Sequence, residues 1–194
     1  MSAIHSVAVF CGSRAGDDPA FAHAARLLGR GMAEAGIRLV YGGGRVGLMG
    51  AVADAVLAAG GEVLGVIPEF LTRLEVAHSG ISEMVVTDSM HSRKQRMFAE
   101  SDAFVSMPGG LGTLDETIEI ITWRQLGLHD KPILVCDVAG SAGPLVGAIE
   151  GAIANGFARP DILRLFELVH GVPALLSRLR ELPAAAAAVP AERL

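Results

Sequence analysis

The sequence predicts an α/β fold, a Rossmann-like doubly wound parallel sheet with helices on both faces. Short runs rich in Val, Ile and Leu alternate with longer segments of helical periodicity, which is the order of elements in such folds. Most of these runs are apolar throughout, as expected of parallel strands that are covered on both faces. Glycine-rich turns follow several of the runs, at the strand ends where parallel sheets bind ligands.

The elements follow from these patterns in chain order. Strands are expected at 6–10, 37–41, 62–68, 82–87, 103–108, 132–136 and 165–170. Helices are expected at about 19–35, 48–59, 89–100, 113–127 and 144–155, with a short helix from about 173. We interpret residues 1–182 as a single nucleotide-binding domain, and the Ala- and Pro-rich segment 183–194 as a disordered tail.

Composition excludes several classes of protein. A net charge of −5 with only 16 Lys and Arg gives no basic footprint for nucleic acid. The two cysteines, Cys11 and Cys136, suggest neither a disulfide framework nor a zinc site, and the six histidines lack ligand spacing. No signal peptide and no apolar run of membrane-spanning length is found. We therefore expect a cytoplasmic protein with no metal, no cofactor and no membrane contact.

Three small-residue loops follow predicted strands. Gly42, Gly44 and Gly47 match G-x-G-x-x-G before a helix that starts near Leu48, where backbone amides can bind phosphate. Taken alone, this pattern is explained equally well by a turn that needs positive φ. Two further loops follow predicted strands in the same way: residues 11–14, which include Ser13, and residues 108–112. Together the three loops predict the floor of a nucleotide site.

Two interpretations of Glu116 remain open from spacing. Thr113 and Glu116 fit the capping-box pattern, in which Glu116 bonds back to a backbone amide at the helix start. A catalytic role is the alternative, since a cap does not require the preceding run of three glycines and a proline. The two roles are not exclusive.

The predicted helix 89–100, with Asp88 or Ser89 as N-cap, carries two adjacent cations. On a helical projection Lys94 falls inside the apolar arc and Arg93 lies on its edge. A cation that faces inward needs an anion, which a bound nucleotide would supply. The alternative is that both side chains extend along the helix to solvent.

These motifs resemble one known family. "MHSRK" (90–94) and "PGGLGTLDE" (108–116), with "YGGG" (41–44), "GLMG" (47–50) and "TWRQLGLHDKP" (122–132), resemble the LONELY GUY cytokinin riboside 5′-monophosphate phosphoribohydrolases, often labelled lysine decarboxylases. The resemblance runs from about residue 6 to about 170 and implies hydrolysis of the N-glycosidic bond of an adenosine 5′-monophosphate, the preferred substrates carrying an N6-isopentenyl or related group. Arg93 and Glu116 match the catalytic pair. The matching substrate contacts are Ser13, Gly43, Gly44, Met49, Glu75, Lys94, Pro108, Gly109, Gly110, Leu111, Gly112, Thr113, Leu114, Asp115 and Thr122.

The residue types agree with that chemistry. Cleavage of a ribosyl C–N bond builds positive charge on the sugar, and a carboxylate such as Glu116 can stabilise that charge or orient the attacking water. Arg93 can hold a phosphate or ribose hydroxyls bidentately. The sequence does not identify the groove for an N6 substituent.

Three other functions compete with this one. A pyridoxal-dependent decarboxylase would need Lys94 or Lys131 as its Schiff-base lysine. A dinucleotide oxidoreductase would use the 42–47 glycines with Glu69 as the ribose-binding acid, but it leaves 108–116 unexplained. A non-catalytic nucleotide carrier or sensor on the same fold would bind AMP without turnover.

The helix 113–129 also predicts assembly. Ile118, Ile121 and Leu126 form an apolar stripe, and Ile120 and Trp123 widen it beyond a single face. The family resemblance implies a homodimer in which the partner completes the site near Thr122. The alternative is that Trp123 lies under the C-terminal segment.

Overall fold

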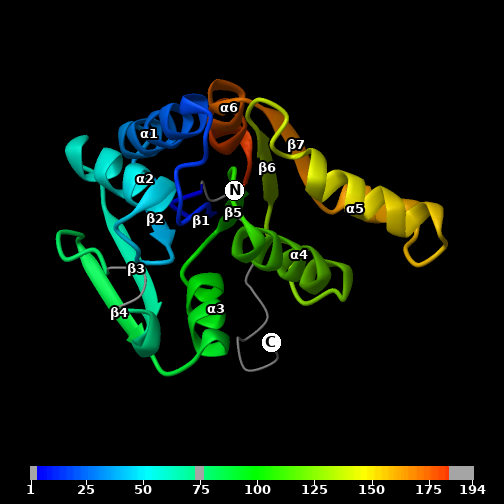
Figure 1. Cartoon of the computed structure of the whole chain (residues 1–194), viewed down its shortest axis with the longest axis horizontal. Coiled ribbons are helices and arrows are strands. Elements are labelled where there is room, and N and C mark those ends of the chain that lie inside the picture. The colour runs from blue at the N-terminus through cyan, green and yellow to red at the C-terminus, as the bar shows by residue number, and fades with distance from the viewer. Residues whose placement is uncertain (1–3, 73–76, 184–194) are drawn as a thin grey trace.

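A computed structural model describes residues 4–72 and 77–183, and within them the strands form one parallel sheet. The strand order is β4-β3-β2-β1-β5-β6-β7, and every adjacent pair is parallel (Figure 1). The strands are β1 Ser6–Phe10, β2 Arg38–Tyr41, β3 Val63–Pro68, β4 Glu83–Thr87, β5 Ala103–Ser106, β6 Ile133–Asp137 and β7 Glu167–His170. The parallel sheet predicted from the apolar runs is confirmed.

Helices cover both faces of the sheet. One buried cluster joins the sheet to α1, α2 and α6, and a second joins it to α3, α4 and α5. The helices are α1 Pro19–Glu34, α2 Gly47–Ala58, α3 Met90–Ala99, α4 Leu111–Gln125, α5 Gly143–Ala154 and α6 Val172–Glu181, with short 3₁₀ helices at Glu69–Leu71 (η1) and Pro160–Arg164 (η2). The doubly wound architecture is therefore also confirmed.

The strand order creates one switch point, between β1 and β5. The chain runs outward from β1 through β2 and β3 to β4, and then returns to place β5 on the other side of β1. Phe10 pairs with Ser106, so the loops that follow these two strands begin side by side. Ligands of open α/β sheets bind in the crevice at such a point.

The start of α4 differs from the expectation. The helix begins at Leu111, and Gly110 is an extended N-cap residue without a side-chain cap. Thr113 is therefore the third helical residue, and its carbonyl accepts a hydrogen bond from Thr117 Oγ1 at 2.6 Å. The capping-box interpretation of Thr113 and Glu116 is wrong, because Thr113 stands inside the helix and not at its cap.

Other differences are small. The strand expected at 103–108 ends at Ser106, and the one expected at 165–170 begins at Glu167 because η2 leads into it. The predicted tail from residue 184 onward lies outside the described residues, and so does Glu75. Within the described part of the chain, no helix is both long and apolar enough to cross a bilayer.

Candidate active site

A cavity of about 220 Å³ lies at the switch point, among the loop after β1, the first turns of α2, α3 and α4, and η1. It brings together many of the residues predicted from sequence. Those that line it are Ser13, Met49, Arg93, Gly110, Leu111, Gly112, Thr113, Asp115 and Glu116. These residues come from four separate segments of the chain, so the fold assembles the predicted constellation.

The other candidates lie near the cavity or away from it. Gly43, Gly44, Lys94, Pro108, Gly109, Leu114 and Thr122 are not among the lining residues. Thr122 is exposed on α4, where its Oγ1 donates to the Ile118 carbonyl at 2.8 Å. The Gly43 carbonyl accepts a hydrogen bond from the His78 amide and so ties the glycine loop to the segment after residue 76.

Four lining residues were not among the candidates. Cys11 and Gly12 directly precede Ser13 at the end of β1, and Met90 is the first residue of α3. Their positions beside predicted site residues were a signal that could have found them. Leu71 closes η1, and no pattern in the sequence places that turn over the cavity.

Arg93 is buried, with 4% of its surface exposed. The helix that carries it starts with a capping box between Ser89 and Ser92. Arg93 Nε donates to the Val66 carbonyl and Nη2 to the Gly42 carbonyl, both at 3.1 Å. A side chain at Gly42 would collide with Nη2, so this position needs glycine. The alternative that Arg93 extends along the helix to solvent is wrong, because the carbonyls of Val66 in β3 and of Gly42 directly after β2 hold it inside.

The helical projection placed Lys94 inside the apolar arc of α3. In the structure its side chain instead points toward α4. Its Nζ lies 2.7 Å from Asp115 Oδ2 and 3.2 Å from Glu119 Oε2. Burial lowers the pKa of Lys94, but the hydrogen bonds and charges of Asp115 and Glu119 outweigh it and raise that pKa above its ordinary value. The anions that an inward cation requires are thus supplied by the protein itself.

The first turn of α4 faces the cavity with no side-chain cap. Leu111, Gly112 and Thr113 are its first three residues; they line the cavity, and no side chain caps their amides. At α2, by contrast, the amides of Leu48 and Met49 donate to the Gly12 carbonyl at 3.0 and 3.3 Å. A helix start with open amides attracts phosphate. This capacity therefore belongs to α4, while the glycine loop before α2 packs against the loop after β1.

Glu116 is half-buried and lines the cavity. Burial first, and then the negative charge of Glu116, raise the pKa of the Cys11 thiol well above its usual range. Cys11 is therefore a neutral thiol, which makes it a poor nucleophile. Among the described residues that line the cavity, the carboxylates are Asp115 and Glu116, and Asp115 Oδ2 lies 2.7 Å from Lys94 Nζ.

Comparison with known proteins decides the family. A family model described as "Possible lysine decarboxylase" matches residues 49–179. A cytokinin riboside 5′-monophosphate phosphoribohydrolase from Rhodococcoides fascians is 46% identical over 156 residues, which cover 80% of this chain and 79% of that protein. One from Arabidopsis thaliana is 43% identical over 175 residues, covering 90% and 81%. The chain belongs to the cytokinin riboside 5′-monophosphate phosphoribohydrolase family.

Solved structures support the fold of this family member. The molybdenum cofactor carrier protein from Chlamydomonas reinhardtii aligns with a TM-score of 0.69 at 18% identity, over 92% of this chain and 97% of that one. A molybdenum cofactor binding protein from Rippkaea orientalis aligns with a TM-score of 0.67 at 19% identity, over 92% and 96%. At this level of identity the likeness concerns the fold alone.

Proposed function

We propose that this phosphoribohydrolase family member hydrolyses the N-glycosidic bond of an adenosine 5′-monophosphate with a modified N6, releasing the cytokinin base and ribose 5-phosphate. The relatives named above carry this activity in their names. One structural observation supports it most strongly. A single cavity joins the uncapped first turn of α4 to Glu116 and to the buried Arg93, which are an anion site, a carboxylate and a cation.

The spacing along α4 suits a ribose 5-phosphate. Glu116 follows the three open amides by three to five residues, which is roughly 5–8 Å along the helix axis. A phosphate at those amides places C5′ and the ribose ring along the cavity, with C1′ toward Glu116. Arg93 supplies a fixed guanidinium to the same space, because its Nε and Nη2 are held by backbone carbonyls.

The reaction then needs one bond broken and one formed. Water attacks C1′ as the C1′–N9 bond breaks, and the electron pair leaves with the base, which takes up a proton from solvent. The proton that the attacking water loses passes to Glu116 and from there back to solvent. Glu116 orients the water, accepts its proton and stabilises the positive charge that develops on the ribose. Holding substrate and water in register supplies much of the rate enhancement in such a step.

The competing functions fit this arrangement less well. Lys94 is paired with two carboxylates, and Lys131 is buried away from the cavity lining, so neither lysine is placed to form a Schiff base there. A dinucleotide fingerprint at 42–47 would need the α2 amides that Gly12 occupies. A carrier without turnover shares the fold, and it would not need a carboxylate one turn beyond its phosphate site.

A base-release assay over a panel of nucleotides tests the proposed reaction. Isopentenyladenosine monophosphate, AMP, GMP and CMP are incubated separately with the protein, and the free base is measured by chromatography. Release from the adenosine monophosphates, fastest for the N6-modified one, is expected. Release of no base from any of the four would contradict a phosphoribohydrolase activity.

Replacing Leu111 with Pro tests the phosphate site at α4. Leu111 is the first helical residue and is 85% exposed, a position where Pro fits a helix but removes one amide N–H. A lost charge-assisted hydrogen bond is expected to lower kcat/KM by about tenfold or more.

The matched control for that variant is Leu111→Ala, which shortens the same side chain and keeps the amide. It is expected to stay within about threefold of wild type, since the hydrogen-bond donor remains. Equal losses in both variants would assign the effect to the leucine side chain and contradict a phosphate site at the amides.

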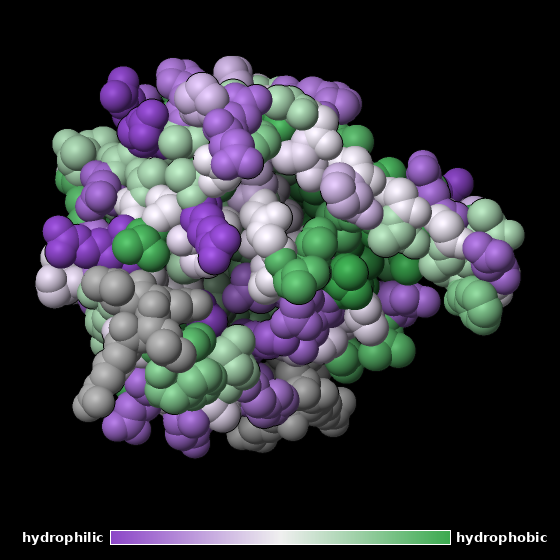
Figure 2. Space-filling view, in the orientation of Figure 1, coloured by the Kyte–Doolittle hydropathy of each residue, from purple (hydrophilic) through white to green (hydrophobic). Residues whose placement is uncertain are grey.

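We also propose that two copies of this chain form a homodimer through α4. Leu111, Ile118 and Leu126 are 85%, 44% and 67% exposed and follow one side of this segment. Figure 2 shows hydrophobic surface gathered at the centre and right of the view, where α4 and α5 lie. Ile120 and Ile121 are buried instead, and Trp123 packs edge-on against Phe98 at 5.5 Å. The proposed interface is therefore narrower than the stripe predicted from sequence.

Light scattering tests this assembly. Wild type is expected at about 40 kDa, twice the 20.1 kDa chain, because twofold pairing is the default way to cover a self-complementary apolar surface. Ile118→Glu should give a monomer, since it places a charge in the proposed interface. A wild-type monomer that is fully active at nanomolar concentration would contradict both the dimer and a partner contribution to the site.

We propose that this protein is cytoplasmic, and its cysteines support that location. Cys11 and Cys136 are both free and buried. Burial, with a smaller effect of the Asp137 charge, raises the pKa of Cys136 to about 11. Thiols of this kind persist in a reducing compartment.

A further inference from the structure

The loop of residues 126–132, between α4 and β6, places two polar side chains in the apolar layer beneath the site. Lys131 is 5% exposed, and its Nζ donates a 2.7 Å hydrogen bond to the Phe98 carbonyl. The same Nζ lies 4.0 Å from the centroid of the Phe98 ring and 5.9 Å from that of Phe104. The ammonium group is thus held by a carbonyl and two aromatic faces.

His129, two residues before Lys131 in the same loop, also points into this apolar layer. It is 7% exposed, and its Nε2 lies 2.9 Å from the Ile120 carbonyl. A carbonyl only accepts, so Nε2 carries the proton. The ring meets Phe98 and Phe104 edge-on at 5.2 and 5.6 Å between centroids. Burial lowers the pKa of His129, which keeps the ring neutral.

The two carbonyls belong to the two helices of the candidate site. Phe98 lies on α3, five residues after Arg93, and Ile120 lies on α4, four residues after Glu116. Each anchor therefore lies roughly one to one and a half helical turns beyond a proposed catalytic residue on the same helix. One short loop thus contacts both α3 and α4.

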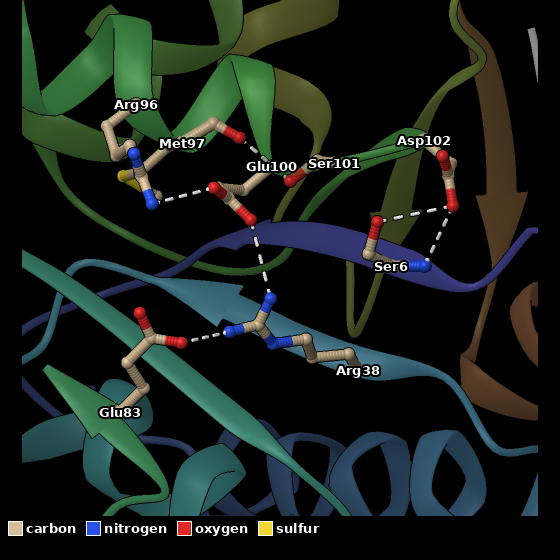
Figure 3. Close-up of polar contacts among 8 residues, drawn as sticks. All are labelled: Ser6, Arg38, Glu83, Arg96, Met97, Glu100, Ser101 and Asp102. Carbon is tan, nitrogen blue, oxygen red and sulfur yellow. Dashed lines mark hydrogen bonds and ion pairs between the residues drawn. The ribbon is translucent and has the colours of Figure 1, made fainter. Parts of the chain in front are cut away.

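Separate contacts tie the end of α3 to the sheet. Arg38 on β2 donates to Glu100 at 3.4 Å, and Ser101 Oγ, next along the chain, closes the last turn of the helix by donating to the Met97 carbonyl at 2.8 Å. Figure 3 shows these contacts together with Asp102, which accepts from the Ser6 amide on β1. They fix α3 relative to β1 and β2. Its placement against α4 depends on the ion pairs of Lys94 with Asp115 and Glu119 and on the two side chains of the 126–132 loop.

We propose that His129 and Lys131 are positioning residues, which set the placement of Arg93 relative to Glu116 by holding α3 and α4 from one loop. This inference rests on the catalytic roles proposed for those two residues. An apolar side chain of similar shape would fill the position of Lys131 without the cost of burying a charge. The contribution of the ammonium group is therefore orientation, and small errors of orientation reduce catalysis strongly.

Paired variants at both positions separate orientation from packing. Lys131→Met and His129→Leu keep the bulk and remove the donor, whereas Lys131→Arg and His129→Gln keep a donor. We expect the first pair to lower kcat about tenfold with KM changed less than threefold, and the second pair to stay within about threefold of wild type. Wild-type kcat in both donor-free variants would overturn the proposal.

A double-mutant cycle with Glu116→Gln measures whether the effect of Lys131 on kcat depends on the Glu116 carboxylate. A purely structural role of Lys131 would not show this dependence. If Lys131 acts by positioning Glu116, Lys131→Met should lower the residual rate of Glu116→Gln by less than twofold, because little is left to position. The same tenfold loss in both backgrounds would overturn positioning. Normal turnover by Glu116→Gln alone would instead refute the proposed catalytic role.

Folding is controlled separately in these comparisons. Rates are compared at a temperature where circular dichroism shows that each variant is folded. If Lys131→Met does not fold, His129→Leu is used in the same cycle.

The pH dependence of stability checks that the amine is buried as described. Burial lowers the pKa of Lys131 to about 8 from an ordinary value of 10.5, against the raising effects of Asp102 and Asp130. Between these two values the unfolded chain binds more protons, so wild-type stability rises with pH through this group. The Tm of wild type minus that of Lys131→Met should therefore increase from pH 8 to pH 10. A constant difference would overturn the buried placement and the proposal with it.

Discussion

Replacing Glu116 with Gln is expected to lower kcat by about 100-fold or more while the protein keeps its fold. Gln has the same shape as Glu but cannot take a proton from water or balance positive charge on the ribose. Because Gly110 and not Thr113 is the N-cap of α4, no capping box is lost with the carboxylate. Steady-state base release, with Tm as the check on folding, measures this effect.

The matched control is Glu119→Gln, one turn further along the same helix. Glu119 lies 3.2 Å from Lys94 and does not line the cavity, so kcat is expected to stay within about threefold of wild type. If Glu116→Gln also keeps near-normal turnover, the carboxylate is not the catalytic group. Equal losses in both variants would point to the charge of α4 as a whole.

Removing the 5′-phosphate from the substrate is expected to lower kcat/KM by about 1000-fold. The proposed phosphate site is the first turn of α4, where Leu111, Gly112 and Thr113 line the cavity and no side chain caps the helix. Binding energy gained there would orient C1′ against Glu116. Isopentenyladenosine and its 5′-monophosphate are compared in the same base-release assay. The loss should fall on kcat as well as on KM, because the phosphate is remote from the bond that breaks.

Ribose 5-phosphate and free ribose provide the control for that comparison. Ribose 5-phosphate should inhibit competitively, and ribose at equal concentration should not, since it cannot occupy the anion site. Equal rates on the nucleoside and the nucleotide would contradict the assignment of a phosphate site at the start of α4.

The fold could be predicted from sequence because buried parallel strands leave a strong local signal. Continuous apolar runs marked β1, β2 and β3, and glycine turns marked the strand ends that converge at the switch point. The start of α4 was misplaced because Thr is a common N-cap and Gly is common in turns. The chain instead uses Gly110 as an extended cap and continues the helix through Gly112 and Thr113.

The orientation of Arg93 and Lys94 could not be predicted, because it depends on groups distant in sequence. A helical projection weighs only the side chains of the helix itself. Arg93 turns inward because carbonyls of Gly42 and Val66 accept its hydrogen bonds, and Lys94 turns toward Asp115 and Glu119 on α4. Similarly, Trp123 was assigned to a surface, whereas it packs on Phe98 from another helix.

We propose that this cavity catalyses hydrolysis and does not merely hold a nucleotide. The most direct test follows free base and ribose 5-phosphate together, by chromatography, with isopentenyladenosine monophosphate in 1000-fold excess over protein. We expect both products to accumulate in equal amounts and to exceed the protein concentration many times. Tight binding of the nucleotide with no release of either product would contradict the hydrolase activity and favour a carrier.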